Sequence, residues 1–286
     1  MKIGFVGLGQ MGGGLARNLI RANKDVLVYD LNQEAIEKTL KAGTSGKAAT
    51  DLQELSAVDV LFTSLPLPKH LEQVMLGEEG LLSLMKSGAT YIDVSTIDPK
   101  TARKLSDAAE EKNINFLQCP LGLTPAHAEE GTLPIYVGGK KAVYEKMKDI
   151  LGIIGGNVIY MGEVEASAAF KIISNLIGMT NLAVLSEGMR IGEKAGIDKQ
   201  LLIELLLETG ASSFQMKVRG PRIANNDFEN KFGLDLALKD IRLGMEMAHQ
   251  WDNIPKTMEV AFEYYKNASE NGYGKEDCNA VYKIIK

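Results

Sequence analysis

The chain opens with Met1-Lys-Ile-Gly-Phe-Val-Gly-Leu-Gly-Gln-Met-Gly12, and the organisation of its first half can be worked out from this stretch. Ile3 to Val6 is a short apolar run rich in β-branched and aromatic side chains, which is typical of a buried strand. Gly7, Gly9 and Gly12 follow at G-x-G-x-x-G spacing. After a strand, such glycines allow a tight turn, the approach of a pyrophosphate to the backbone, and close packing of the next helix.

The glycine spacing alone is weak evidence, because glycines are common in turns, so the surrounding sequence matters. An amphipathic helix pattern follows the glycines, and a second strand, Asp25 to Tyr29, ends at Asp30. An acid about 20 residues beyond the glycines is where an acceptor for a ribose hydroxyl is expected. The free N–H groups and the dipole of the helix stabilise phosphates. We therefore predict a dinucleotide site, rather than an ordinary strand-turn-helix without a ligand, at Gly7, Leu8, Gly9, Gln10, Met11, Gly12 and Asp30.

The composition of the chain excludes several classes of protein. It has 286 residues, 45% hydrophobic and 24% charged, which is ordinary for one large or two medium globular domains. The net charge of −5 predicts neither a nucleic-acid nor a membrane partner. No apolar run reaches the roughly 18 residues of a membrane span, and the first strand leaves no room for a signal peptide.

The cysteines and histidines show no metal-ligand spacing. Cys119 and Cys278 are too few for a disulfide framework and favour reduced thiols in a cytoplasmic protein. His70, His127 and His249 are isolated in the sequence. We therefore predict no metal site.

Strand and helix patterns alternate over the first half of the chain. The expected strands are Lys2–Val6, Asp25–Tyr29, Val58–Ser64, Thr90–Val94, Asn115–Cys119, Leu133–Gly138 and Asn157–Tyr160. The expected helices between them include Gln33–Ala42, Lys69–Leu76, Pro99–Lys112 and Lys140–Ile154. This alternation predicts an α/β Rossmann-type fold, with a parallel sheet and helices on both faces.

The pattern changes near Gly162, after which no convincing strand occurs. One long helix is expected over Glu163–Ala195. Shorter helices are expected over Asp198–Thr209, Ser213–Asn225, Leu234–Trp251, Ile254–Asn271 and Cys278–Ile285. We therefore predict a dinucleotide-binding domain over residues 1–162 and an all-helical domain over residues 163–286. The long helix is apolar over most of its circumference, which favours burial between domains or subunits and hence a homodimer or homotetramer.

Five short segments, spread over essentially the whole chain, are specific in their order and spacing. They are Gly4-Phe-Val-Gly-Leu-Gly-Gln-Met-Gly12, Asp93-Val-Ser-Thr-Ile-Asp-Pro99, Gly131-Thr-Leu with Gly138-Gly139, Lys171-Ile-Ile-Ser-Asn175, and Lys239-Asp240. In these segments the chain resembles the β-hydroxyacid dehydrogenases, which include 3-hydroxyisobutyrate dehydrogenase, tartronate semialdehyde reductase and sulfolactaldehyde reductase. The resemblance implies a second domain like that of 6-phosphogluconate dehydrogenase. It also implies an oxidoreductase that acts on a small hydroxyacid or aldehyde, and Asp30, whose carboxylate would repel a 2′-phosphate, favours NAD(H) as its cofactor.

The resemblance implies roles for individual residues. Lys171 matches the catalytic lysine, and Asn175 matches the asparagine that positions the substrate. Lys239 matches a lysine near the nicotinamide, and further cofactor contacts are implied at Leu65, Pro66 and Thr96. The loop Pro120–Thr124 matches a segment, usually Pro-Val-Ser-Gly-Gly, that grips the substrate carboxylate. The predicted substrate contacts are Ser95, Gly122, Leu123, Thr124, Lys171 and Asn175.

The chemistry of the same residues supports some of these roles and leaves alternatives for others. Lys171 and Asn175 are four residues apart, so both point to one helix face. An apolar surrounding lowers a lysine pKa toward the range useful for proton transfer, although a lysine can also extend its charge to water. Ser95 and Thr96 follow a strand at the sheet edge where ligands bind, or they cap a helix ahead of Pro99. Lys239 taken alone is typical of a solvated charge.

The predicted substrate loop departs from the usual family pattern. Gly122 replaces a serine, while Leu123 and Thr124 replace two glycines. A Pro-x-Gly-x-Thr loop is closer to the sulfolactaldehyde reductase branch, which carries an arginine where this chain has Leu123. A leucine cannot pair with a sulfonate or carboxylate.

Three further departures lie on the long helix. Glu165 and Ser167 replace glycines, Ser174 replaces an asparagine, and Glu165 would repel an anionic substrate if it faced the site. Two alternatives therefore stay open. One is a reductase of imines or of less anionic aldehydes, and the other is a non-catalytic dinucleotide-sensing protein.

Overall fold

The computed structural model describes residues 1–77 and 79–286, and these form two compact units. Unit 1 comprises residues 1–171 and unit 2 comprises residues 172–286. The predicted domain boundary at residues 162 and 163 lies just before helix α8 (Val164–Lys194), whereas the compact units divide within that helix.

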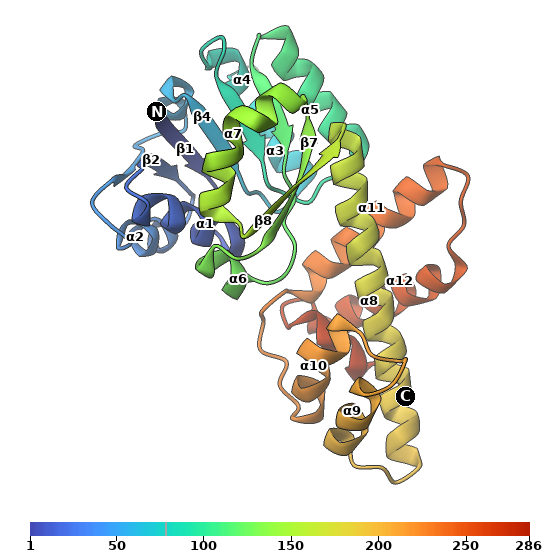
Figure 1. The fold of residues 1–286 in the computed structure, drawn as a ribbon. Coiled ribbons are helices and arrows are strands. Elements are labelled where there is room, and N and C mark those ends of the chain that lie inside the picture. The colour runs from blue at the N-terminus through green and yellow to red at the C-terminus, as the bar shows by residue number, and fades with distance from the viewer. Residues whose placement is uncertain (78) are drawn as a thin grey trace. The chain divides into compact units, whose positions relative to one another are not determined.

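Over the described residues, unit 1 contains an eight-stranded sheet in the order β3-β2-β1-β4-β5-β6-β7-β8 (Figure 1). The strands are β1 (Lys2–Val6), β2 (Asp25–Tyr29), β3 (Gly46–Ala48), β4 (Val60–Thr63), β5 (Thr90–Asp93), β6 (Asn115–Gln118), β7 (Pro134–Gly139) and β8 (Asn157–Gly162). Neighbouring strands pair in parallel except β6 and β7, which are antiparallel. The predicted Rossmann-type fold is confirmed, and the sheet is parallel as predicted apart from the β6–β7 pair.

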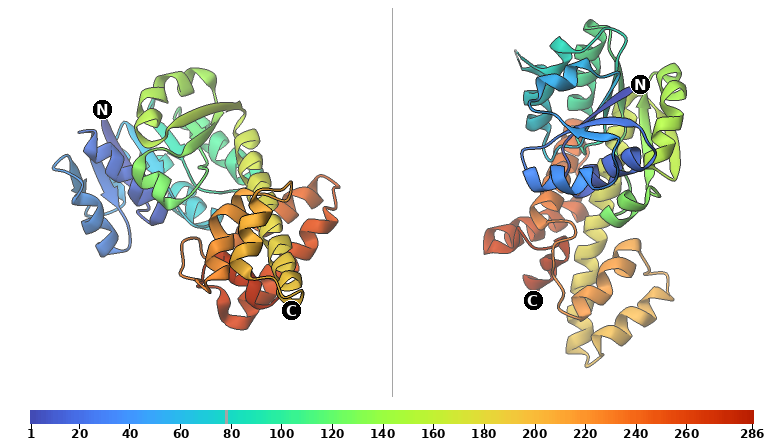
Figure 2. Two further views of the ribbon diagram at one scale, coloured as in Figure 1. Left: turned by 60° about the horizontal axis from the view of Figure 1, so that its bottom comes forward. Right: turned by 90° about the vertical axis from the view of Figure 1, so that its left-hand side faces the viewer.

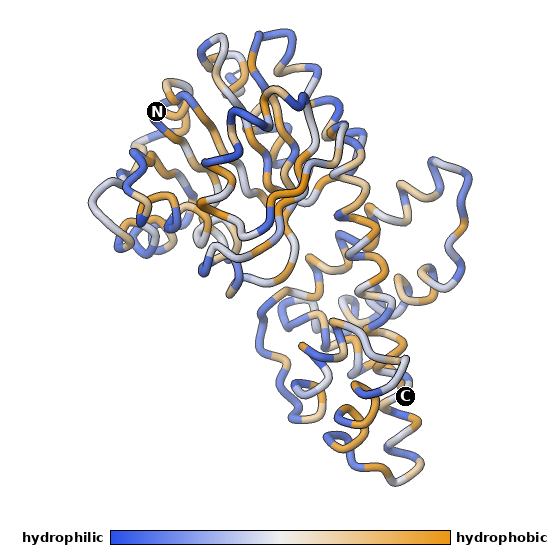
Figure 3. Tube along the Cα trace, in the orientation of Figure 1, coloured by the Kyte–Doolittle hydropathy of each residue, from blue (hydrophilic) through white to orange (hydrophobic). Residues whose placement is uncertain are grey.

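Helices cover both faces of the sheet in unit 1. Side chains from α1 (Gln10–Arg21), α2 (Gln33–Leu40), α6 (Pro125–Glu130) and α7 (Lys141–Ile154) share one core cluster with the strands. Side chains from α3 (Pro68–Leu76), α4 (Leu81–Leu84), α5 (Pro99–Glu111) and the start of α8 share another. In Figure 3 the strands between these helices are mostly hydrophobic.

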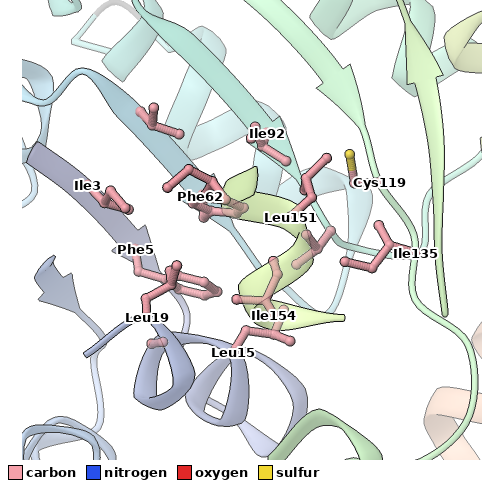
Figure 4. Packing of buried hydrophobic residues seen from close by; sticks show 14 of the residues in the cluster. Ile3, Phe5, Leu15, Leu19, Phe62, Ile92, Cys119, Ile135, Leu151 and Ile154 are labelled. Carbon is pink, nitrogen blue, oxygen red and sulfur yellow. The ribbon is translucent and has the colours of Figure 1, made fainter. Parts of the chain in front are cut away.

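The first core cluster shows why β1 and α1 form where the sequence predicts them. Phe5 is fully buried and stacks on Phe62, with ring centroids 5.5 Å apart. Leu15 and Leu19, one turn apart on α1, point toward these rings, and Leu151 on α7 approaches from beside them (Figure 4). Each such buried side chain contributes about 1.5–3 kcal/mol.

Four elements of unit 1 were missing from the prediction, namely β3, the 3₁₀ helix η1 (Gln53–Ala57), α4 and α6. Strand β3 has only three residues and no buried side chain, so no apolar alternation marks it. Helix α6 is short, but Pro125 stands in its first turn and Gly131 ends it at a left-handed φ of 68°. Proline at the start and glycine just past the end are helix signals that the sequence carries. Figures 1 and 2 show α6 beside α1.

Unit 2 is helical, apart from one isolated bridge between Gly233 and Asp277 in the described chain. It contains most of α8, followed by α9 (Lys199–Leu207), α10 (Phe214–Ala224), α11 (Leu234–Gln250) and α12 (Lys256–Ala268). A π-helical turn, Ser269–Tyr273, and a 3₁₀ helix, Cys278–Lys283, close the chain. The predicted α-helix over Cys278–Ile285 is therefore corrected to a 3₁₀ helix.

Buried polar contacts at Asp277 explain that tight 3₁₀ turn. The Asp277 carboxylate caps the turn, accepting from the N–H of Asn279 at 3.2 Å, from Phe232 N–H at 2.9 Å and from Arg219 Nε at 3.0 Å. Burial alone would raise the pKa of Asp277, but the charge of Arg219 and these N–H donors hold it below its ordinary value. Hydrogen bonds from several parts of the chain thus hold the start of this turn in place, which favours a short 3₁₀ helix.

Helix α8 is long and apolar enough, by length and composition, to cross a membrane, whereas the sequence analysis expected no span. Half of its apolar window is buried within the protein, and core helices pass the same test. Its exposed apolar residues include Ile173, Ile177, Val184 and Ile191. Their spacings of four and seven residues place them on one face. The helix therefore carries an exposed apolar stripe in addition to its buried face.

Candidate dinucleotide and substrate site

The structure gives a different geometric reason for a glycine at each of the three positions in the first turn. Gly7 has φ of +90°, and a Cβ there would collide with the Ser64 carbonyl oxygen. A Cβ on Gly12 would collide with the Gly7 carbonyl oxygen. A Cβ on Gly9, in contrast, would meet no atom within 4 Å. The chain around Gly9 is therefore open, as a loop that a pyrophosphate approaches must be.

Asp30 lies at the end of β2 and holds this loop. Its carboxylate accepts hydrogen bonds from the N–H of Leu8 at 2.6 Å and from the N–H of Asn32 at 2.7 Å. These bonds fix the acid beside the glycine turn, and each carboxylate oxygen can accept a further donor. Asp30 thus occupies the position predicted for a ribose contact.

A groove of about 480 Å³ lies at the N-terminal end of α1. It is lined by the predicted residues Leu8, Gly9 and Gln10 and by Arg17, Asn32, Glu34, Ala35, Lys38, Pro125, Ala126 and Glu129, which were not predicted. The predicted Met11 packs instead against the core of unit 1. Open space at Gly9, a helix N-terminus and an adjacent acid fit a dinucleotide phosphate and ribose.

Arg17 and Glu129 form an ion pair at this groove that sequence reasoning missed. Arg17 Nε donates to both Glu129 oxygens, at 3.1 and 2.9 Å, and Arg21 pairs with the same carboxylate. A Cβ on Gly13 would lie 2.9 Å from the Arg17 guanidinium, and one on Gly14 would lie 2.9 Å from the backbone of α6. The glycine run therefore lets both the arginine and α6 lie close to α1.

Ser95 ties the ends of β4 and β5 together. Its hydroxyl accepts from Leu65 N–H at 2.9 Å and donates to the buried Asp93 carboxylate at 2.6 Å. Burial raises the pKa of Asp93, although the bonds from Ser95 and Thr63 act in the opposite direction. The Ser95 side chain is thus engaged in positioning the Leu65–Pro66 turn. Thr96 is half-buried at the same edge of the sheet.

The helix cap ahead of Pro99 is neither Ser95 nor Thr96. Asp98 caps α5, accepting from the N–H of Thr101 at 2.9 Å. The capping alternative for Ser95 and Thr96 is therefore wrong, and the acid next to the proline performs that role.

The predicted substrate loop is fastened to β7. Gly122 N–H donates to the Pro134 carbonyl at 2.9 Å, and Tyr136 N–H donates to the Pro120 carbonyl at 3.0 Å. Leu123 adopts a left-handed φ of 62° and is 44% exposed. Thr124 Oγ1 lies 2.7 Å from His127 Nδ1, a contact that orients the imidazole ring.

The start of α8 places Lys171 against the sheet. A Cβ on Gly138 of β7 would collide with the Ser167 hydroxyl, which donates to the Gln118 carbonyl at 3.2 Å. This close approach locks the turns of α8 that precede the lysine. Lys171 itself is half-buried, and its neighbour Phe170 packs on Tyr136 with ring centroids 4.5 Å apart.

Glu165 does not stand as a lone negative charge on α8. Arg103 of α5 donates to it from Nε at 2.5 Å and from Nη2 at 2.7 Å. These hydrogen bonds lower the pKa of Glu165, so it stays an ion-paired carboxylate. Its charge is offset, which removes the reason to expect repulsion of an anionic substrate.

In unit 2, Asn175 and Lys239 meet at a residue that the sequence analysis named only as a neighbour. Asn175 Nδ2 donates to Asp240 Oδ2 at 2.6 Å, and Lys239 Nζ lies 2.6 Å from Asp240 Oδ1. Asp240 is buried. Because a buried carboxylate requires partners, this arrangement fixes the Asn175 amide and the Lys239 ammonium together. Ser174 is exposed beside them on α8.

Comparison with known protein families supports this description of both units. Residues 2–162 match the NAD binding domain of 6-phosphogluconate dehydrogenase, and residues 166–285 match the NAD-binding domain of NADP-dependent 3-hydroxyisobutyrate dehydrogenase. The chain belongs to the β-hydroxyacid dehydrogenase family. Like other β-hydroxyacid dehydrogenases, it is an oxidoreductase that uses a nicotinamide dinucleotide.

Individual relatives extend over the whole chain. The 2-(hydroxymethyl)glutarate dehydrogenase of Eubacterium barkeri is 33% identical, over 99% of this chain and 94% of that protein. The glyoxylate/succinic semialdehyde reductase 2 of Arabidopsis thaliana is 30% identical, over 100% of this chain and 80% of that protein. The crystal structure of 3-hydroxyisobutyrate dehydrogenase from Salmonella typhimurium matches with a TM-score of 0.91 and 28% identity, over 99% of both chains.

Proposed function

We propose that this β-hydroxyacid dehydrogenase interconverts a small β-hydroxyacid and the corresponding aldehyde, with NAD(H) as cofactor and Lys171 as the proton donor or acceptor. The observation that carries the proposal is the fixed position of the lysine. It follows turns of α8 that are locked to the sheet by Gly138 and Ser167, and Asn175 comes one turn later. The names of the two closely similar relatives, a hydroxyacid dehydrogenase and a semialdehyde reductase, support this substrate class.

The roles of the chain's own residues follow from where they lie. Gly7 to Gly12 and Asp30 would hold the dinucleotide, which, when bound, gives or takes the hydride at the substrate carbon. In reduction Lys171 Nζ donates a proton to the substrate oxygen as the C–H bond forms, and the product is an alcohol. In oxidation the same amine accepts that proton. Asn175, oriented by Asp240, holds the oxygen in position.

The choice of NAD(H) over NADP(H) is supported by charge at the groove. Asp30 presents a fixed carboxylate at the end of β2, and such an acid repels a 2′-phosphate. Glu129 offsets Arg17, and Glu34 lies in the same groove as Lys38. The groove therefore offers no excess of positive charge to a 2′-phosphate.

A reduction assay tests the proposed reaction class. NADH oxidation would be measured with glyoxylate, succinic semialdehyde and a cyclic imine, and NAD⁺ reduction with 3-hydroxyisobutyrate. Turnover of aldehyde acids or the hydroxyacid, with kcat/KM at least about tenfold above that for the imine, supports the proposal. Preference for the imine would favour the imine reductase alternative. Nucleotide binding without turnover of any compound would favour the dinucleotide-sensing alternative.

Cofactor choice has its own test in the same assay. We expect kcat/KM with NADH to exceed that with NADPH by at least about tenfold, since like charges at close range oppose binding. Asp30→Asn should narrow this ratio by improving NADPH. Asp25→Asn, at the exposed start of the same strand, should leave the ratio unchanged. Equal or better use of NADPH by the natural chain would refute the assignment.

The proposed assembly is a homodimer or homotetramer in the cytoplasm. The apolar stripe of α8 supports association, because exposed apolar surface of this kind is commonly buried between subunits. Light scattering at micromolar concentration would measure the mass of the assembly. A monomer at that concentration would contradict the proposal. The two buried free thiols, Cys119 and Cys278, are compatible with a reducing compartment.

A further inference from the structure

Tyr136 on β7 and Gly122 of the predicted substrate loop lie close together. The loop and the strand are joined by the Gly122 and Tyr136 backbone bonds and by a bridge between Leu121 and Ile135. A Cβ on Gly122 would lie 2.6 Å from Pro134 Cγ and 3.1 Å from the Tyr136 hydroxyl oxygen. The phenol oxygen therefore stands close to where a side chain at position 122 would begin.

The ring of Tyr136 connects this loop to the turn of α8 that carries Lys171. It packs on Phe170, the residue immediately before Lys171, with ring centroids 4.5 Å apart and planes tilted by 58°. The hydroxyl end of the same ring reaches Gly122. One side chain thus spans from the loop to the helix turn of the proposed proton donor, and all of these residues belong to unit 1.

The Tyr136 hydroxyl differs from the hydroxyls of Tyr91, Tyr144 and Tyr160 in unit 1, each of which has a hydrogen-bond partner. Tyr160 donates to the Gly139 carbonyl at 2.9 Å, and Tyr91 lies 3.0 Å from the Thr63 hydroxyl. Across residues 1–77 and 79–286, no side-chain hydrogen bond is found for the Tyr136 hydroxyl. Burial raises the pKa of Tyr136, so the phenol keeps its proton at neutral pH. It is available as a donor on a half-buried ring.

We propose that the Tyr136 hydroxyl, which lies close to where a side chain at position 122 would begin, binds the carboxylate of the substrate. The inference rests on the proposed function and adds a specificity-determining residue to it. A serine hydroxyl at position 122 and the Tyr136 hydroxyl would compete for the same space. This chain combines the glycine with the tyrosine, and Leu123 brings no charge to the loop. A neutral phenol donor then supplies the hydrogen bond that a small anionic substrate requires.

Tyr136→Phe, with Tyr160→Phe as the matched control, tests this role. Steady-state kinetics on a turned-over hydroxyacid or aldehyde acid should show KM for that compound raised about tenfold or more by Tyr136→Phe. We expect kcat to stay within a few-fold and KM for the nucleotide to be unchanged. Tyr160→Phe removes a hydroxyl bonded only to backbone and should leave all three constants unchanged. A merely structural role would instead lower stability without this selective change in KM.

A second pair of variants moves the hydroxyl instead of deleting it. Gly122→Ser alone should raise KM, because the new side chain would crowd Pro134 Cγ and the Tyr136 hydroxyl. Gly122→Ser combined with Tyr136→Phe should recover part of the loss, because the loop then supplies the hydroxyl. Thermal melts and nucleotide titration would show that each variant is folded. Recovery in the double variant supports the proposal, and a double variant no better than Tyr136→Phe contradicts it.

The outcomes separate this inference from the proposed function. If the natural chain turns over a substrate and Tyr136→Phe leaves its KM unchanged, the inference is overturned and the proposed function stands. If no compound is turned over, titration of 3-hydroxyisobutyrate into the NAD⁺ complex measures binding directly. Binding weakened by Tyr136→Phe and not by Tyr160→Phe supports the inference, while absence of binding by the natural chain overturns both.

Discussion

The two sides of unit 1 that carry the site are built differently. On the proposed dinucleotide side, Gly7, Gly9 and Gly12 would act through the backbone and through the absence of a side chain. On the proposed substrate side, Leu123 and Thr124 of the loop and Tyr136 of β7, to which the loop is bonded, would act through their side chains. A site formed by the backbone requires glycines at fixed spacing, so it can be recognised in the sequence. In a site formed by side chains, the residues change with substrate specificity. The sequence then indicates where the site lies but not which ligand it binds.

Leu123 shows that the loop keeps its backbone shape while its side chains change. The family pattern has glycine at this position, and Leu123 still adopts the left-handed φ of 62° that glycine accepts readily. Holding a leucine there costs about 1–2 kcal/mol. Its side chain is nevertheless exposed rather than packed in the core. The strain is therefore not compensated by burial of the leucine, which is consistent with a role for this side chain at the substrate.

Lys171→Ala should give the largest effect, and it should fall on the substrate side alone. General acid–base catalysis is worth about 10²–10⁴-fold, so kcat should fall by at least that range. The dissociation constant for NADH, measured by fluorescence, should change little, because Gly7 to Gly12 and Asp30 would hold the cofactor.

Two further variants control that result. Lys171→Arg should not restore activity, because guanidinium stays protonated and differs in shape. Lys194→Ala, at the far end of the same helix, should behave as the natural chain. A Lys171→Ala enzyme within a few-fold of the natural kcat would show that the catalytic assignment is wrong.

Gly9→Val should give the next largest effect, on the dinucleotide side. Open space surrounds the position of its Cβ, so the fold should accept the substitution, but the side chain would occupy the approach of the pyrophosphate. We expect NADH affinity to fall by about 10²-fold, equivalent to about 2.7 kcal/mol. Gly152→Val is the matched control, since a Cβ there also meets no atom within 4 Å. Equal NADH titrations for both variants would argue that the phosphates bind elsewhere.

Much of the fold can be predicted from local sequence patterns, and the elements that cannot be predicted in this way have physical reasons. Strands β1 and β2 and the lengths of α1 and α8 depend on apolar runs and on periodicity, which are visible along the chain. The three-residue β3 has no apolar pattern. Strand β7 pairs antiparallel to β6, to which it is joined by a short connection through α6. The amino-acid composition of a strand does not indicate whether it pairs in the parallel or the antiparallel direction.

The site could be predicted where one residue acts alone and not where two distant residues act as a pair. Lys171, Asn175 and Asp30 are predicted from spacing and from resemblance. The partner of Asn175 is Asp240, 65 residues away, and the partner of Arg17 is Glu129, 112 residues away. Such pairs arise only when tertiary packing brings their elements together. The same holds for Arg103, whose pairing with Glu165 removed an expected repulsion.

Leu123→Arg should produce a moderate effect that is confined to the substrate side. An arginine there should favour a substrate with a second anionic group, because guanidinium pairs with carboxylate or sulfonate oxygens. We expect kcat/KM for a dianionic aldehyde to rise about tenfold relative to a monoanionic one, with KM for NADH unchanged. Leu84→Arg, at a leucine of equal exposure (44%) on α4, is the control. An unchanged preference would mean that position 123 does not face the substrate.

The prediction with the smallest expected effect concerns the contact between the dinucleotide side and the substrate side of unit 1. Glu129 lies on α6, shortly after the substrate loop, and its ion pair with Arg17 joins that helix to the dinucleotide groove. Hydrogen bonding from Arg17, together with Arg21, lowers the pKa of Glu129 from 4.5 to about 2 despite the cost of burial. A carboxyl with a depressed folded-state pKa stabilises the protein above about pH 4.5, and this stability is lost as the pH falls toward 2.

Glu129→Gln should therefore lower the melting temperature modestly at pH 7, by about 2–4 °C, and progressively less below pH 4.5. The amide still accepts from Arg17, but the charge that offsets the buried guanidinium is gone. Glu130→Gln is the control, because among the described residues the side chain of this exposed neighbour accepts a long hydrogen bond from the Thr132 hydroxyl, at 3.4 Å, and forms no ion pair. Melting curves of both variants from pH 7 to pH 3 measure the effect. If the two variants changed in parallel over this range, the ion pair would not couple α6 to α1, and the two sides of the site would be independent.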